Sequence, residues 1–294
     1  MPRVTPLQFL IAESETAEQR EARRRTAGSS SAETYADTLR SIAPASCCDI
    51  VRPHDSGPAS APPQPLASYD AVFLSGSPMH VYADTPQTRR QLAFMRAVYA
   101  AGIPSFGSCA GLQVATAAAG GRVRKSPRHE IAFARRITAT SEGRAHPLLR
   151  GRPAAWDALA IHSDAVEQLP PGATRLAGNE ACPVQAAVIP YENGVFWGVQ
   201  YHPELTIAEI AAAMRRQIDD LLDQGIPRTE AEQHIALIDA LGADPQRADL
   251  AWRLGIDAEI TDPARRHLEL ANFIEAVRRH GVRGLAVSGA NALC

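Results

Sequence analysis

The sequence predicts an α/β fold with a doubly wound, mostly parallel sheet. In the first 125 residues, short apolar runs of strand length alternate with longer segments of helical periodicity. Alternation of this kind is typical of a parallel sheet with helices on both faces. After residue 121 strand-like runs predominate, and from residue 206 onward the pattern is helical. A C-terminal helical segment is therefore expected beside the sheet.

The elements of the first half follow from apolar runs and turn residues. Strands are expected at 7–12, 48–51, 69–74 and 103–106, and helices at 31–42, 85–101 and 112–119. Arginines at 20–25 are interleaved with Glu18 and Glu21, a pattern that favours a solvated helix face. In the second half, strands are expected at 131–138, 156–161, 174–177, 184–189 and 194–199, and helices at 207–222, 229–241, 247–254 and 265–279.

Composition excludes several classes of protein. The chain has 294 residues, 45% of them hydrophobic, which is enough for a sizeable core. A net charge of -2 gives no general attraction to nucleic acid or to an anionic membrane. No signal peptide or membrane-spanning run is recognised, and the five cysteines are sparse, so a cytoplasmic location is expected. Histidines and cysteines lack metal-ligand spacing, so neither a metal nor a cofactor is expected.

The segment GSCAGLQ at 107–113 has the form of a nucleophile elbow. Gly107 and Gly111 flank Cys109 at an expected strand-to-helix turn, where small neighbours allow a sharp turn that exposes the middle side chain. Ser108 has no such pair of glycines, so the register selects Cys109. A helix that begins just after this residue also favours the thiolate. Taken alone, the motif is equally compatible with a buried structural cysteine.

A base and an orienting acid are found at the end of a later strand. The segment QYHPE at 200–204 places His202 and Glu204 two residues apart, so they lie on one side if the strand continues through them. His202 is 93 residues after Cys109. A cysteine nucleophile requires a base held by a third group, and these two residues supply both roles.

A third motif, SGSP at 75–78, follows the strand expected at 69–74. Small residues at the carboxyl end of such a strand lie where open α/β sheets bind ligands. The N–H groups of Ser77 and Ala110 are the candidate donors of an oxyanion hole.

These three motifs, in this order, resemble those of the class I glutamine amidotransferases, and most of all the glutaminase domain of GMP synthase and its stand-alone relatives. The resemblance covers about residues 5–204 and implies a flavodoxin-like fold. It implies that Cys109 attacks the side-chain amide of glutamine, that His202 transfers protons and that Glu204 orients it. Gln113 and Gly76 match positions that bind substrate, and the segment containing His162 and Asp164 borders the active site in such domains. A structural hydrogen bond is equally compatible with His162.

The C-terminal part departs from the family pattern. The family closes with a helix that contains an Asn-Phe pair soon after the His-Pro-Glu turn, whereas Asn272 and Phe273 lie much later here. The expected division is an amidotransferase domain at 1–204, a helical insertion at 205–264, the closing helix at 265–280 and a loose tail at 281–294. Alternating Arg and Asp in the insertion suggests either a solvated lid or a partner-docking surface.

Three functions are compatible with these residues. The first is a glutaminase subunit that hydrolyses L-glutamine and passes ammonia to a synthetase or ligase partner, because the chain carries no acceptor-activating motif. The second is a γ-glutamyl hydrolase that uses the same triad on a γ-glutamyl amide or peptide. The third, a non-catalytic binding or regulatory protein, is disfavoured by three intact motifs.

Overall fold

A single sheet of nine strands organises the chain in the computed structural model, which describes the backbone of residues 6–291 and the side chains of residues 6–279. The strand order is β2-β1-β3-β4-β9-β8-β7-β5-β6. The first five strands in this order are parallel, namely β2 (Cys47–Val51), β1 (Gln8–Ala12), β3 (Ala71–Leu74), β4 (Ser105–Ser108) and β9 (Gly194–Val199). The carboxyl ends of these strands therefore meet along one edge.

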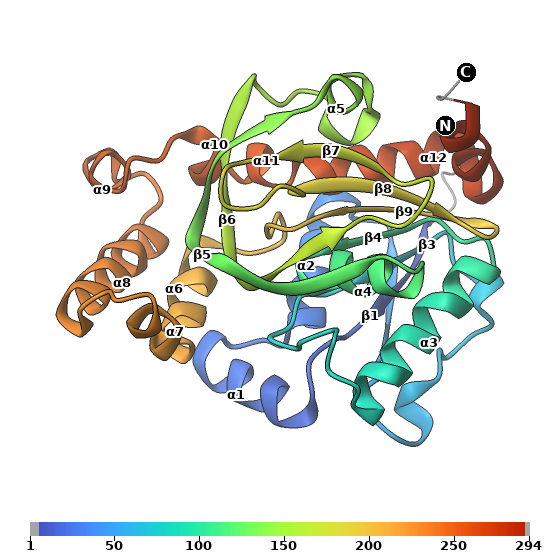
Figure 1. Cartoon of the computed structure of the whole chain (residues 1–294), viewed down its shortest axis with the longest axis horizontal. Helices are drawn as coiled ribbons and strands as arrows, with labels where there is room; N and C mark the ends of the chain where they lie inside the picture. Colours follow the sequence, from blue (N-terminus) through green and yellow to red (C-terminus); the bar gives the residue numbers. More distant parts are fainter. Residues whose placement is uncertain (1–5, 292–294) are drawn as a thin grey trace.

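Antiparallel strands complete the sheet. They are β8 (Ala186–Tyr191), β7 (Thr174–Gly178), β5 (Arg122–Ala139) and β6 (Ala155–Gln168). The long strands β5 and β6 are joined through the short helix α5 (Ser141–Ala145) and rise beside the carboxyl ends of the parallel strands (Figure 1). They form one wall of the region in which the sequence motifs meet.

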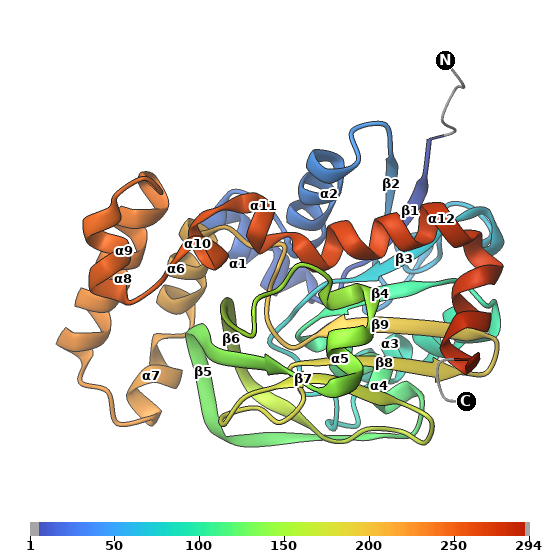
Figure 2. The same ribbon diagram turned by 90° about the horizontal axis from the view of Figure 1, so that it is seen from above.

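Helices cover both faces of the sheet, as Figure 2 shows. Helices α2 (Ser31–Ile42) and α12 (Leu268–Asn291) lie on one face, where Tyr35 and Phe273 pack against Phe73. Helices α3 (Pro86–Ala100) and α4 (Ala110–Ala118) lie on the other face, with an apolar core of their own. The predicted doubly wound α/β fold is confirmed.

The C-terminal helices form a third apolar cluster against β5 and β6. They are α6 (Ile207–Arg216), α7 (Ile218–Asp223), α8 (Arg228–Ala243), α9 (Ala248–Leu254), α10 (Ala258–Thr261) and α11 (Pro263–Arg266). Ile210 and Ile238 pack with Phe133 and Leu159 of the sheet. The C-terminal helices are thus packed onto the sheet through an apolar core, while their alternating charges at 244–249 are exposed.

Several local expectations are corrected. The strand expected at 103–106 is β4, two residues later, and the following helix begins at Ala110 rather than at residue 112. The tail expected to be loose from 281 belongs to α12 as far as Asn291, and residues 292–294 lie outside the described part. Within the described residues no helix is long and apolar enough to cross a membrane.

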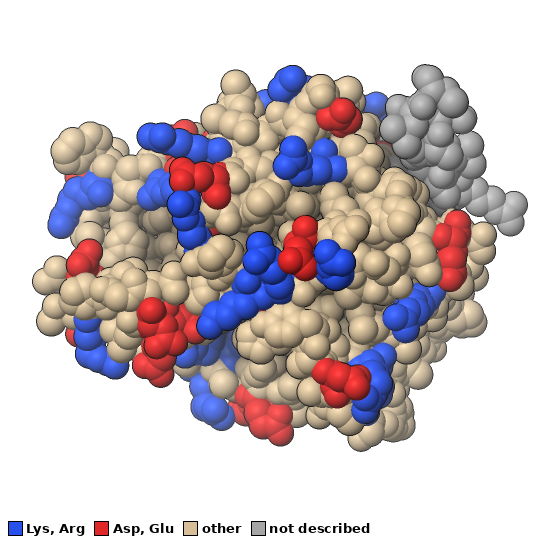
Figure 3. Space-filling model, in the orientation of Figure 1, with Lys and Arg blue, Asp and Glu red and all other residues tan. Residues whose placement is uncertain are grey.

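The arginine-rich stretch is the expectation that differs most. Helix α1 (Ala17–Ala27) carries it, but Arg20 and Arg23 are only 7% exposed. Arg20 pairs with Asp55 at 2.6 Å, and Arg23 pairs with Glu209 at 3.1 Å, so carboxylates elsewhere in the chain compensate their burial. On the visible face of the molecule, positive and negative side chains are interspersed (Figure 3).

Candidate active site

Cys109 occupies a strained turn between β4 and α4. Its backbone has φ 52° and ψ -110°, a conformation that residues other than glycine rarely adopt and that is typical of functional elbows. A Cβ added to Gly111 would lie 2.6 Å from the carbonyl oxygen of Leu74, and one added to Gly107 would lie 3.0 Å from Gly111 Cα. Close packing therefore excludes a side chain at position 111, and one at position 107 would require its neighbours to shift by a few tenths of an ångström.

His202 and Glu204 lie in the loop after β9 and meet beside Cys109. His202 Nδ1 is 2.7 Å from Glu204 Oε1. The strand does not continue through them, because β9 ends at Val199 and the N–H of His202 donates instead to Leu159 O at 2.8 Å. The two side chains still lie together, so the predicted pairing holds although its predicted cause does not. The other ring nitrogen, Nε2, is buried and has no described hydrogen-bond partner.

The surroundings of His202 favour its charged form. Burial opposes an imidazolium, but the carboxylate of Glu204 and the nearby sulfur of Cys109 outweigh it and raise the pKa of His202 to about 10. With Nδ1 occupied by Glu204, the proton on Nε2 is the one available for transfer.

A buried hydrogen-bond chain continues from Glu204 into the core. Ser108 Oγ is 2.9 Å from Glu204 Oε1, and Tyr35 Oη is 2.7 Å from Ser108 Oγ. A carboxylate only accepts, so Ser108 donates to Glu204 and Tyr35 must donate to Ser108. The serine that the register excluded as the nucleophile thus holds Glu204, the candidate orienting acid.

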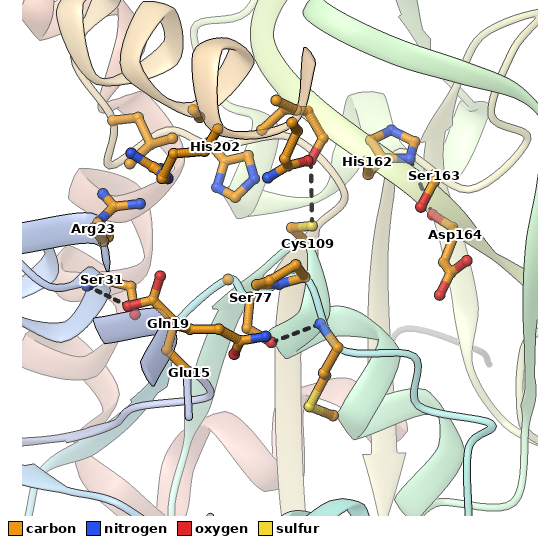
Figure 4. A pocket seen from close by; sticks show the side chains of 18 of the residues that line it. Glu15, Gln19, Arg23, Ser31, Ser77, Cys109, His162, Ser163, Asp164 and His202 are labelled. Carbon is orange, nitrogen blue, oxygen red and sulfur yellow. Dashed lines mark hydrogen bonds between the residues drawn. The ribbon is translucent and has the colours of Figure 1, made fainter. Parts of the chain in front are cut away.

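The candidate oxyanion donors border the same space. Gly76 and Ser77 follow β3 and line the cavity with Cys109 (Figure 4). A Cβ on Gly76 would lie 2.6 Å from His202 Cε1 and 3.7 Å from Cys109 Cβ, so glycine is required for the imidazole to approach. Ala110 is the first residue of α4, and its N–H consequently has no partner within the helix.

A cavity of about 380 Å³ opens beside Cys109, in the size range of small-molecule sites. Gln113 lines it and donates to Asp164 O at 3.0 Å. The Asp164 carboxylate, also at the cavity, lies 2.7 Å from His80 Nδ1 and accepts from Tyr82 Oη at 3.1 Å. Gln113 and Asp164 therefore stand where the sequence expected substrate contacts and an active-site border.

His162 also lines the cavity, held from behind by a buried polar network. Its Nε2 is 2.9 Å from Glu130 Oε2, and its Nδ1 is 3.0 Å from Asp164 O. Glu130 also accepts from Asn179 at 2.6 Å. The ligand atoms of Glu130, His162 and Cys182 lie within 4.8 Å of one another, but hydrogen bonds occupy the carboxylate and burial raises the pKa of Cys182 to about 12. The network therefore supports the His162 ring structurally.

Four charged residues at the cavity were not found from the sequence. Glu15 follows β1, Arg23 belongs to α1, Arg216 ends α6 and Asp220 belongs to α7. Arg23 was assigned to a solvated face, and the other three stand in no motif. Helical periodicity alone carries no signal that these segments converge on residue 109.

Comparison with known proteins agrees with this geometry. The family model for glutamine amidotransferase class-I matches residues 28–218, and the chain belongs to this family. A Pseudomonas protein named gamma-glutamyl-L-1-hydroxyisopropylamide hydrolase is 32% identical over 278 residues, which are 92% of each chain. The GMP synthase of Wolinella succinogenes is 34% identical over 167 residues, which are 56% of this chain but only 30% of that enzyme.

Solved structures confirm the flavodoxin-like fold of this family. A glutamine amidotransferase of Thermotoga maritima superposes with a TM-score of 0.64 over 93% of this chain and 98% of its own, at 19% identity. A glutamine amido transferase from Methylobacillus flagellatus gives a TM-score of 0.59 over 92% of this chain and 95% of its own, at 21% identity.

Proposed function

We propose that this chain hydrolyses N-substituted γ-glutamyl amides to glutamate and an amine through a Cys109 thioester. The observation that carries this proposal is the match to the Pseudomonas hydrolase, which extends over 92% of both chains. The family model ends at residue 218, and the Wolinella GMP synthase matches only 56% of the chain. The match to the Pseudomonas hydrolase therefore extends into the C-terminal helices.

The chemistry proceeds in two steps. The Cys109 thiolate attacks the γ-carbonyl carbon, and the N–H groups of Ser77 and Ala110 stabilise the oxyanion. His202, oriented by Glu204, gives its Nε2 proton to the departing nitrogen as the C–N bond breaks. The same imidazole then takes a proton from water, which attacks the thioester and releases glutamate and the thiolate.

A second candidate is the hydrolysis of glutamine itself to supply ammonia to an acceptor enzyme. The match to GMP synthases favours it, because 34% identity to the Wolinella enzyme extends over 56% of this chain. In that case the amidotransferase part would be residues 1–204 closed by the helix at 265–280, with 205–264 as the site for a synthetase or ligase partner. The two candidates share Cys109, His202 and Glu204 and differ in the leaving group.

Separate assays with two leaving groups distinguish the two candidate functions. The purified full chain is given γ-glutamyl hydroxyisopropylamide and, separately, L-glutamine, and glutamate release is measured. We expect kcat/KM for the substituted amide to be higher by about 10-fold or more, as one well-placed hydrogen bond provides. Cys109→Ala should abolish release from both compounds, while Cys48→Ala, the matched control, should keep it. A preference for glutamine would favour the second candidate instead.

A further inference from the structure

Different side chains line the two ends of the cavity beside Cys109. The glutamyl group of the substrate would occupy only one of these ends. Resting on the proposed function, we propose that α1 and the C-terminal helices form the subsite for the amine half of the substrate. In this subsite Arg216 selects amides whose amine substituent carries a neutral hydroxyl group.

Cys109 lies between the two ends, as Figure 4 shows. On one side are His162, Ser163 and Asp164 of β6, and Gln113 of α4 lies against Asp164. The Asp164 carboxylate there suits the charged α-amino group of a glutamyl moiety. On the opposite side are Glu15 and Arg23, and the leaving nitrogen departs toward this side if the glutamyl group occupies the other.

Residues of the C-terminal helices close the amine side. Ala213 and Arg216 of α6 line the cavity together with Glu15 and with Arg23 of α1. The Arg23–Glu209 ion pair at 3.1 Å ties the two helices together at this place. The wall is therefore built jointly by elements far apart in the sequence.

Hydrogen-bond donors at this wall are left without partners. Arg23 is 7% exposed, and its Nε is buried with no partner among the described residues. Arg216 donates to Thr26 Oγ1 at 2.7 Å but makes no ion pair with any described residue. Arg23 and Arg216 line the same cavity, and burial and the neighbouring Arg23 lower the pKa of Arg216. An acceptor on the substrate would satisfy these donors.

Carboxylates at the same wall decide which acceptor fits. Glu15 lines the cavity and Glu209 pairs with Arg23, so two carboxylates already balance the guanidinium groups of Arg23 and Arg216. An anionic substituent, such as the carboxylate of a γ-glutamyl amino acid, would therefore add an uncompensated negative charge at this wall. An alkyl substituent would leave the arginine donors desolvated and unpaired. A hydroxyl accepts from arginine and donates to a carboxylate, so it satisfies both kinds of neighbour.

Two adjacent arginines of α6 provide the test. Arg216 lines the cavity, whereas Arg215 is turned away and pairs with Asp239 of α8 at 2.8 Å. Arg216→Met and Arg215→Met thus remove the same charge one residue apart. Three substrates are compared, namely γ-glutamyl 2-hydroxyethylamide, the isosteric γ-glutamyl propylamide, and glutamine.

We expect Arg216→Met to lower kcat/KM for the hydroxyethylamide by about 10- to 100-fold, the size of a hydrogen bond to a charged donor. Propylamide and glutamine should stay within about 3-fold, Arg215→Met should leave all three substrates unchanged, and Arg216→Lys should restore part of the loss. Equal losses for all three substrates, or none for the hydroxyethylamide, would overturn the subsite. Failure of the proposed function is distinguishable, because the unaltered chain would then release glutamate from none of the amides.

Discussion

Removal of the Ser108 hydroxyl tests the buried chain that holds Glu204. In Ser108→Ala, Glu204 Oε1 loses a donor at 2.9 Å, and Tyr35 Oη loses its acceptor at 2.7 Å. Tyr35 is fully buried, so no water replaces the missing partner without rearrangement of the core. Two separate costs therefore arise from one substitution.

The magnitude follows from these two contacts. A hydrogen bond to a charged group contributes about 1.5–3 kcal/mol, and a buried hydroxyl left unpaired costs about 1–3 kcal/mol. We expect Ser108→Ala to lower the free energy of unfolding by about 3–5 kcal/mol. Tyr35→Phe removes only a bond between neutral groups and should cost about 1 kcal/mol. The double variant leaves no buried hydroxyl without a partner. Its loss in free energy of unfolding should therefore be about 1–3 kcal/mol smaller than the sum of the losses in the two single variants.

Urea denaturation of the four proteins measures this cycle. Ser105→Ala is the matched control, because Ser105 is buried on the same strand but makes only a long contact, 3.4 Å, to Val195 O. In the same series, kcat/KM should fall in Ser108→Ala and remain near the original value in Ser105→Ala. Strict additivity of Ser108→Ala and Tyr35→Phe would refute the hydrogen bond between Tyr35 and Ser108.

Three further predictions concern His202 and the loop after β3. The free energy of unfolding should fall as pH rises from about 6.5 to about 10, because the folded protein keeps a proton on His202 that the unfolded chain has released. Glu204→Gln, which removes the largest cause of the raised pKa, should flatten this slope in denaturation series at different pH, and an unchanged slope would contradict the assignment. Gly76→Ala should lower kcat by about 100-fold or more by displacing the imidazole, as loss of proton transfer does. Ser77→Ala should stay within about 3-fold, since an oxyanion donor there is a main-chain N–H; a large loss would assign the role to the hydroxyl.

Features encoded by short motifs were predictable from the sequence. The glycines around Cys109 report local backbone strain, and the apolar run before residue 200 reports a buried strand, so the candidate nucleophile and base could be named without coordinates. The parallel half of the sheet followed from the same local patterns. Errors there were shifts of two residues, as for β4, because strand ends depend on pairing with neighbours.

Features that depend on distant pairing were not predictable. Arg23 looked solvated because its partner, Glu209, lies 186 residues away. Glu130 was missed because nothing near it in the chain reveals that it faces His162. His202 and Glu204 were correctly paired for a wrong reason, since a loop held by Leu159 O replaces the expected strand. In each case burial created by another element determines the role of the residue.

The position of β9 has a consequence for how the protein acquires its activity during synthesis. This strand, the last of the sheet to be made, inserts between β4 and β8. Until it arrives, β4 has no neighbour on one side, and Cys109 has been synthesised without its candidate base, His202. We therefore expect a ribosome-bound chain shorter than about 200 residues to be inactive and to expose a strand edge that favours aggregation. Insertion of β9 pairs this edge and brings His202 to Cys109 in the same late step. The sheet and the candidate active site are therefore completed together.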